Sequence, residues 1–206
     1  AKPEIRARRR KALQIADHQI LVMTVGRITR EKGVFELIEA ITLAAERDPR
    51  IVCVLVGAKP AFDETAAVQR CLAQIPALKG RIRLLPASPP DKVWEYLCAA
   101  DLFAFTSHHE GMPNSLLEAM SMGIPAVAFA IPPVREIANG TDGVVTVPPF
   151  DVVRLAEAML RLAVSPAERM RIGKQGQALV KERFLVQQNM AVALKHLAQI
   201  GPQDSA

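Results

Sequence analysis

Short, continuous runs of apolar residues alternate along the chain with longer stretches in which apolar residues recur at helical spacing. The runs are typical of strands that are buried on both faces of a parallel sheet. They occupy residues 20–25, 51–56, 81–86, 102–105, 125–129 and 143–147. Helices are predicted at residues 34–47, 63–74, 91–100, 114–122 and 133–138, and from 151 to about 200 with breaks near Pro166 and Phe184.

The regular alternation of six strands with helices predicts the fold class. We expect an α/β protein with a doubly wound, parallel, six-stranded Rossmann-like sheet, helices on both faces and a helical C-terminal extension. The expected strand order is 3-2-1-4-5-6, because crossovers between parallel strands are right-handed. We divide the chain into a basic lead or interdomain connection (1–18), a Rossmann-like domain (19–183), and a C-terminal helix and tail (184–206).

Charge is unevenly distributed along the chain. There are 26 Lys and Arg residues against 21 Asp and Glu residues, which gives a formal net charge of +5. Residues 1–11 alone contain six bases and one acid, so the remaining chain is neutral. A broad nucleic-acid-binding face is therefore excluded, and the basic lead is interpreted as a solvated helix face or a linker. A contact between this lead and anionic lipid headgroups or RNA is the alternative.

Cysteine usage and hydropathy indicate a soluble cytoplasmic protein. Cys53, Cys71 and Cys98 lie in apolar stretches without the spacing of metal ligands, which favours reduced thiols. No apolar run approaches the roughly 18 residues that a membrane span needs, and no signal peptide is visible.

The predicted functional site lies where the strand order reverses. In doubly wound sheets, ligands bind at this point, beyond the carboxyl ends of the strands. The predicted order places it between the first and fourth strands. The loops that leave those strands, residues 26–33 and 106–115, are also the two most polar loops of the chain. We therefore expect the site between these loops.

The first of these loops carries cations. Gly26 allows a sharp turn after the strand. Arg27, Arg30 and Lys32 follow it, before Gly33. These cations suit a diphosphate, since an arginine chelates two oxygens and a lysine supplies a point charge. A solvated basic loop paired with Glu31 is the alternative. The loop has neither the G-x-G-x-x-G nor the Walker sequence, which argues against an NAD-dependent oxidoreductase and a P-loop NTPase.

The second loop ends at the start of a helix, where free backbone N–H groups and the helix dipole favour an anion. The predicted backbone donors are those of Met112, Asn114, Ser115 and Leu116. Glu110 and Glu118 carry carboxylates that accept hydrogen bonds from sugar or ribose hydroxyls. The alternatives are a solvated loop acid for Glu110 and an acid that complements the helix dipole for Glu118.

Two other chemistries are not expected in the second loop. His108 and His109 are adjacent, so their side chains point apart, and no third ligand is spaced for a metal. Ser115 lacks the G-x-S-x-G turn that surrounds an activated serine in hydrolases. We therefore expect neither a metal site nor a serine nucleophile.

Several motifs resemble the donor-binding half of family 4 glycosyltransferases. They are Gly26-Arg27 with Glu31-Lys32-Gly33, Val56-Gly57, Ala100-Asp101-Leu102-Phe103, Glu110-Gly111 with Glu118-Ala119-Met120, Gly123-x-Pro125, Arg135-Glu136-Ile137 and Asp142-Gly143. The resemblance covers roughly residues 19–183. It implies the GT-B architecture of two Rossmann-like domains, retaining transfer of a sugar from a nucleotide-activated donor, and an active site without a metal or other cofactor.

The resemblance also implies a role for each matching residue. Arg27 and Lys32 would neutralise the donor diphosphate. Glu110 would face the donor sugar, and Glu118 would hold the ribose hydroxyls. The remaining contacts would come from Leu85, Pro86 and Ala87 to the base, and from backbone groups of residues 112–116 to the phosphates and sugar.

Together with these residues, the resemblance implies the donor half of a hexosyltransferase that uses a UDP- or GDP-sugar. The acceptor-binding N-terminal half of this family has no counterpart in the 206 residues, so it is expected in the same or a separate chain. This chain alone is expected to be inactive, and the full-length enzyme to be cytoplasmic or associated with a membrane. The alternatives are a nucleotide-sugar epimerase-like domain and a non-catalytic binding or scaffold domain.

Overall fold

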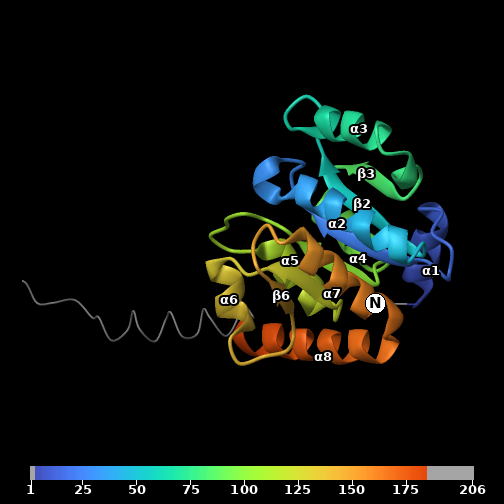
Figure 1. Cartoon of the computed structure of the whole chain (residues 1–206). Helices are drawn as coiled ribbons and strands as arrows, with labels where there is room; N and C mark the ends of the chain where they lie inside the picture. Colours follow the sequence, from blue (N-terminus) through green and yellow to red (C-terminus); the bar gives the residue numbers. More distant parts are fainter. Residues whose placement is uncertain (1–2, 185–206) are drawn as a thin grey trace, which may run out of the picture.

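Six parallel strands form one sheet in the computed structural model, which describes residues 3–184 (Figure 1). The strand order is β3-β2-β1-β4-β5-β6, which confirms the predicted order. Every neighbouring pair of strands is parallel. The strands are β1 (Ile20–Val25), β2 (Ile51–Ala58), β3 (Ile82–Pro86), β4 (Leu102–Phe105), β5 (Ala126–Phe129) and β6 (Val145–Val147).

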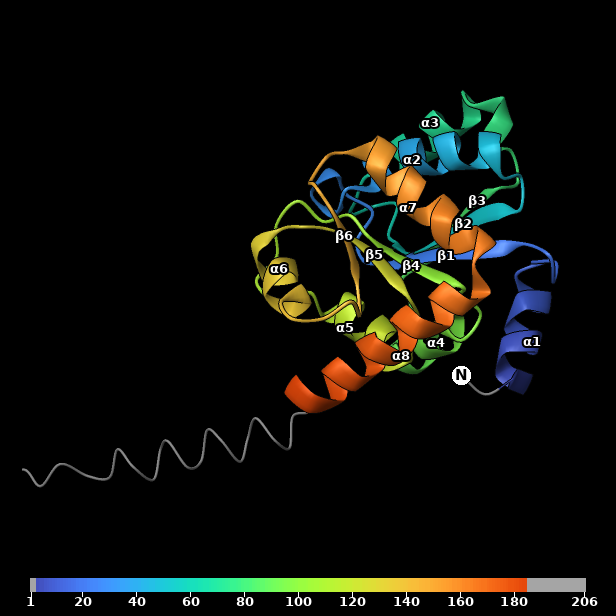
Figure 2. The same cartoon turned by 60° about the horizontal axis from the view of Figure 1, so that its bottom comes forward.

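Helices cover both faces of the sheet. On one face α2 packs against α7, and on the opposite face α5 packs against α8 (Figure 2). The helices are α1 (Pro3–Ala12), α2 (Val34–Arg47), α3 (Thr65–Ala73), α4 (Pro90–Leu97), α5 (Asn114–Ser121), α6 (Pro132–Ala138), α7 (Val152–Val164) and α8 (Pro166–Arg183), with 3-10 turns η1 (Arg30–Lys32) and η2 (Pro76–Leu78). The predicted break near Pro166 falls between α7 and α8, whereas the predicted helix after Phe184 lies outside the described residues.

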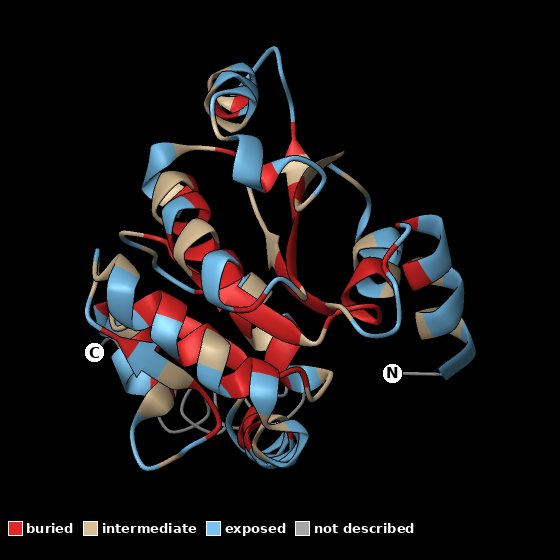
Figure 3. Ribbon diagram, turned by 45° about the vertical axis from the view of Figure 1, so that its right-hand side comes forward, coloured by how far each residue is buried: buried red, intermediate tan, exposed pale blue. Residues whose placement is uncertain are grey.

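The core lies between the sheet and the inward faces of the helices, where the buried residues gather (Figure 3). All residues of β4 and β5 are buried, including Phe103 and Phe129. Burying a side chain of this size contributes about 2–3 kcal/mol. Cys53 is also buried in β2, and this desolvation raises the pKa of its thiol, so the thiol stays protonated.

The basic lead is only partly a solvated face, because α1 is anchored to the sheet by two arginines. Arg10 is 5% exposed, and its Nη1 lies 2.9 Å from Oδ2 of Asp101. Arg6 reaches the other carboxylate oxygen at 2.6 Å and also donates to the carbonyls of Ala99 and Ala100, just beyond the end of α4. The expectation of a solvated helix or linker is therefore wrong for Arg6 and Arg10, although it holds for Arg8, which is exposed.

Glycines let α8 lie close to the loops on its face of the sheet. A Cβ atom on Gly173 would be 2.1 Å from the carbonyl oxygen of Gly123, and one on Gly176 would be 2.7 Å from that of Gly143. Since neither space admits a side chain, α8 is held at backbone-contact distance. Among the helices of residues 3–184, none is long and apolar enough to cross a membrane.

Candidate functional site

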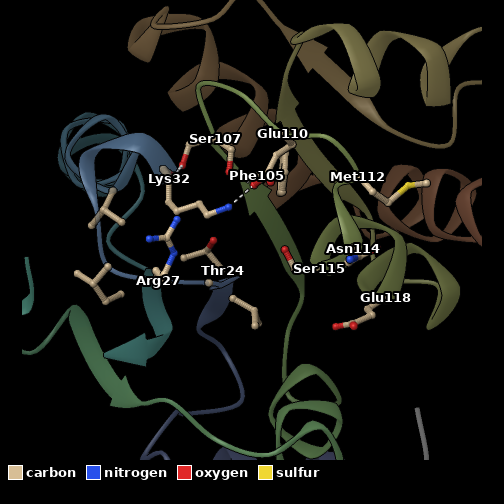
Figure 4. A pocket seen from close by; sticks show the side chains of 15 residues that line it. Thr24, Arg27, Lys32, Phe105, Ser107, Glu110, Met112, Asn114, Ser115 and Glu118 are labelled. Carbon is tan, nitrogen blue, oxygen red and sulfur yellow. Dashed lines mark hydrogen bonds and ion pairs between the residues drawn. The ribbon is translucent and has the colours of Figure 1, made fainter. Parts of the chain in front are cut away.

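A cavity of about 310 Å³ opens between the carboxyl ends of β1 and β4 (Figure 4). These strands are neighbours in the sheet, but β1 leads into α2 on one face and β4 leads into α5 on the other. The chain therefore diverges at this point and leaves a crevice, as the predicted strand order requires. The cavity is lined by Thr24, Val25, Gly26, Arg27, Ile28, Lys32, Val34, Phe105, Thr106, Ser107, Glu110, Met112, Asn114, Ser115 and Glu118.

The two loops that form the walls are joined through their backbones. Gly33 has a φ of 65°, and a Cβ atom there would be 1.9 Å from the carbonyl oxygen of Thr106. The Thr106 hydroxyl donates to the carbonyl of Lys32 at 3.0 Å, and the His108 N–H donates to the carbonyl of Glu31 at 2.9 Å. These contacts fix the position of one wall relative to the other, and only glycine fits at position 33.

An ion pair connects the two walls. Lys32 Nζ lies 2.5 Å from Oε1 of Glu110, and the Ser107 hydroxyl donates to the same oxygen at 2.9 Å. Both side chains of the pair are largely shielded, with 25% of Lys32 and 17% of Glu110 exposed. Shielding strengthens this charge-assisted interaction relative to a pair at the open surface. The cation and the carboxylate are therefore held at one point of the cavity wall.

The other two cations of the first loop, Arg27 and Arg30, have different surroundings. Arg27 lines the cavity, but its side chain is 64% exposed, and its guanidinium lies 3.6 Å from Glu31. An exposed pair of this length contributes little, so Arg27 is available to an anion. Arg30 instead lies over the ring of Phe35 and 3.4 Å from Glu64, away from the residues that line the cavity.

Only some of the predicted backbone donors at the start of α5 are free to bind an anion. The Asn114 N–H donates to the carbonyl of Met112, and the Leu116 N–H donates to that of Pro113. Within residues 3–184, the N–H groups of Met112 and Ser115 have no such partner. These two are therefore the donors open to an anion, together with the dipole of α5. Figure 4 shows Glu118 on the same side of the cavity, one turn into α5.

Not every predicted site residue lines the cavity. Gly26, Arg27, Lys32, Glu110, Met112, Asn114, Ser115 and Glu118 do, whereas Leu85, Pro86 and Leu116 do not. Leu85 and Pro86 end β3, which is separated from β1 by β2. Leu116 is fully buried in the core. The roles given to these three residues therefore stay predictions without support from the cavity.

Sequence reasoning missed three hydroxyl-bearing residues of the cavity, Thr24, Thr106 and Ser107. Thr24 stands within the apolar run of β1, where the continuous pattern concealed it. Thr106 and Ser107 directly follow β4, and their place at a strand's carboxyl end was a signal that could have found them.

The two histidines of the second loop have separate surroundings. The Nε2 atom of His108 lies 3.1 Å from Oε1 of Glu36 on α2, and its ring packs on Phe150. His109 is exposed. In the part of the chain that the structure describes, no group of three or more His, Cys, Asp or Glu side chains could hold a metal ion.

The sheet order, the layered helices and the polar cavity at the reversal point define a Rossmann-like α/β domain of the GT-B glycosyltransferase architecture. The chain belongs to the family of group 1 glycosyl transferases, whose family model matches residues 5–179.

Comparison with known proteins gives the extent of the similarity. The chain is 36% identical over 152 residues to TuaC of Bacillus subtilis, a glycosyltransferase named for teichuronic acid biosynthesis. That match covers 74% of this chain and 35% of TuaC. The crystal structure of Anabaena HepE in complex with UDP and glucose is 26% identical, with a TM-score of 0.82, and the match covers 95% of this chain and 53% of HepE.

The lengths of these matches show which domain of the relatives the chain resembles. The chain spans between about a third and half of these two relatives. By contrast, it covers 95% of the isolated C-terminal domain of the group 1 glycosyl transferase LpcC from Francisella tularensis, with a TM-score of 0.78 and 22% identity. The described fold is therefore that of a C-terminal GT-B domain.

Proposed function

We propose that this chain is the donor-binding half of a retaining glycosyltransferase that transfers a sugar from a UDP- or GDP-sugar. The observation that carries the proposal is the cavity between β1 and β4, in which Arg27 and Lys32 come from one wall and Glu110 and Glu118 from the other. Cations suit the diphosphate, and carboxylates suit the hydroxyls of ribose and sugar. The UDP and glucose bound in the HepE structure support the same class of ligand.

The chemistry follows from where charge develops. When the bond between the sugar and the diphosphate breaks, negative charge grows on the diphosphate, and the cationic groups must already be in place to stabilise it. Lys32 is held by Glu110 at 2.5 Å, and the N–H groups of Met112 and Ser115 lie at the start of α5. Removing one such donor typically raises the barrier by about 3 kcal/mol.

The acceptor is assigned to an N-terminal domain in the same or a separate chain, so the isolated chain binds the donor without turning it over. The proposed residue roles are those already given: Arg27 and Lys32 at the diphosphate, Glu110 at the sugar and Glu118 at the ribose. We also propose that the full-length enzyme is cytoplasmic and that it contacts a membrane surface.

Calorimetric titration with UDP and GDP tests the proposal. Arg27→Ala should weaken binding about ten-fold, because it removes a guanidinium from the cavity. Arg30→Ala is the matched control, since Arg30 is in the same loop but pairs with Glu64 instead, and should leave binding within about two-fold. If neither nucleotide binds at about 1 mM, or if both variants bind like the wild type, the proposal is wrong.

A further inference from the structure

The loop between β4 and α5 carries Ser107 and Glu110, and a side chain outside the cavity holds it in place. That side chain is His108. Its Nε2 atom lies 3.1 Å from Oε1 of Glu36 on α2, and its ring centroid lies 4.5 Å from that of Phe150, in the loop between β6 and α7. Three segments that are far apart in the sequence therefore meet at one imidazole.

Partial burial makes the contact between His108 and Glu36 stronger than a surface pair. The side chains are 22% and 23% exposed, so water screens them incompletely. Among residues 3–184, the second carboxylate oxygen of Glu36 is buried and has no hydrogen-bond partner. The carboxylate therefore depends on His108 for the hydrogen bond that compensates its burial.

Phe150 is in a strained conformation where it meets His108. Its φ is 66°, a left-handed value that is unfavourable for a bulky side chain. The residue is also 58% exposed, so burial of its ring repays little of this strain. Its ring nevertheless packs against His108 and lies 6.2 Å from that of Phe129. Strain that persists beside a functional loop points to a role for the residue there.

We propose that His108 is a positioning residue for donor binding, held by Glu36 and Phe150. By fixing its own loop on α2 and on the loop after β6, it keeps the cavity wall that carries Ser107, Glu110 and the open N–H of Met112 in place around the ligand. This inference rests on the proposed function, because the group that it positions is the wall of the donor cavity. It adds His108, which does not line the cavity, to the residues that the proposed function uses.

Titration of the full chain with UDP and GDP, with hydrogen exchange of residues 106–112, tests the proposal. His108→Ala should weaken nucleotide binding about ten-fold and accelerate exchange in the loop. His108→Gln can still donate to Glu36, so it should restore binding to within about three-fold.

Two further variants separate positioning from general stability. His109→Ala is the matched control, since His109 is the exposed neighbour, and it should bind like the wild type. Phe150→Gly removes the packing on His108 and also relieves the strain at φ 66°. It should therefore weaken binding several-fold without lowering the melting temperature, a combination that loss of fold stability cannot produce.

The outcomes distinguish this inference from the proposed function. If the wild-type chain binds neither UDP nor GDP, the proposed function fails and the inference with it. If the wild type binds, and H108A or F150G binds equally well, the proposed function stands and the positioning role is wrong. Failure of H108Q to bind more tightly than H108A also overturns the role.

Discussion

Lys32 and Glu110 reach each other across the cavity, with Nζ 2.5 Å from Oε1, although they are 78 residues apart in the sequence. The ammonium group of Lys32, which suits a diphosphate, is thus already paired with the carboxylate of Glu110. An arriving diphosphate competes with Glu110 for the ammonium group, and binding replaces one ion pair by another.

This competition predicts opposite effects for the two partners. Glu110→Gln removes the competing charge, so the affinity for UDP without a sugar should rise about three-fold to ten-fold. Lys32→Ala removes the cation, and the same affinity should fall about ten-fold or more. Calorimetry with UDP measures both. Weaker UDP binding by E110Q would contradict the competition.

The anchor of α1 predicts a large difference between two arginines of one helix. Arg10→Ala leaves Asp101 without its most buried partner, which should lower the free energy of unfolding by about 3 kcal/mol. Arg8→Ala, on the exposed side of the same helix, should change it by less than about 0.5 kcal/mol. Urea unfolding of both variants is the measurement. Equal effects would mean that α1 does not depend on Asp101.

Close packing of α8 predicts that an added methyl group is destabilising. Gly173→Ala would place Cβ 2.1 Å from a backbone oxygen of Gly123, so the helix must shift, at a cost of about 2–3 kcal/mol despite the better helix propensity of alanine. Lys174→Ala, one position along and exposed, should be nearly neutral. Thermal unfolding compares the two. A stabilised G173A chain would show that α8 is not held at backbone contact.

A pH dependence of stability is expected from Asp48, at the end of α2. The side-chain hydrogen bonds from Arg50 lower the pKa of this carboxyl below its ordinary value of 3.8, although burial opposes the shift. A lowered pKa in the folded state stabilises the fold above the unfolded value, and this stability disappears as the pH falls through the folded value. Asp48→Asn should therefore be less stable than the wild type near pH 6, and the difference should shrink below about pH 4.

Unfolding in urea at several pH values measures this difference. Asp17→Asn serves as the control, because Asp17 is exposed, and its stability should follow that of the wild type. A difference between D48N and wild type that stays constant down to pH 3 would contradict the assignment to Asp48.

Local pattern was sufficient for the fold and insufficient for the side-chain geometry of the site. The strands could be predicted because β1, β2, β4 and β5 are apolar on both faces, which leaves no other place for them than a covered parallel sheet. The strand order then located the cavity. The contact between Lys32 and Glu110 could not be predicted, because it depends on rotamers and on a close approach of the two loops that Gly33 allows.

The contacts of the basic lead, residues 1–11, could not be predicted from its charge either. Counting residues 1–11 suggested a solvated segment, because a sum of charges carries no information about distant partners. Arg10 is buried since Asp101, 91 residues later, accepts its hydrogen bond. Asp101 also accepts from the N–H of Leu21, so one carboxylate joins a helix and two strands. Such long-range pairs become visible only in three dimensions.

The position of that carboxylate separates the anchor of α1 from the candidate site. Asp101 precedes β4 and contacts the start of β1, whereas the cavity lies at the opposite ends of the same two strands. The anchor of α1 and the lining of the cavity therefore lie at opposite edges of the sheet, so a substitution in the anchor leaves the residues of the cavity wall unchanged.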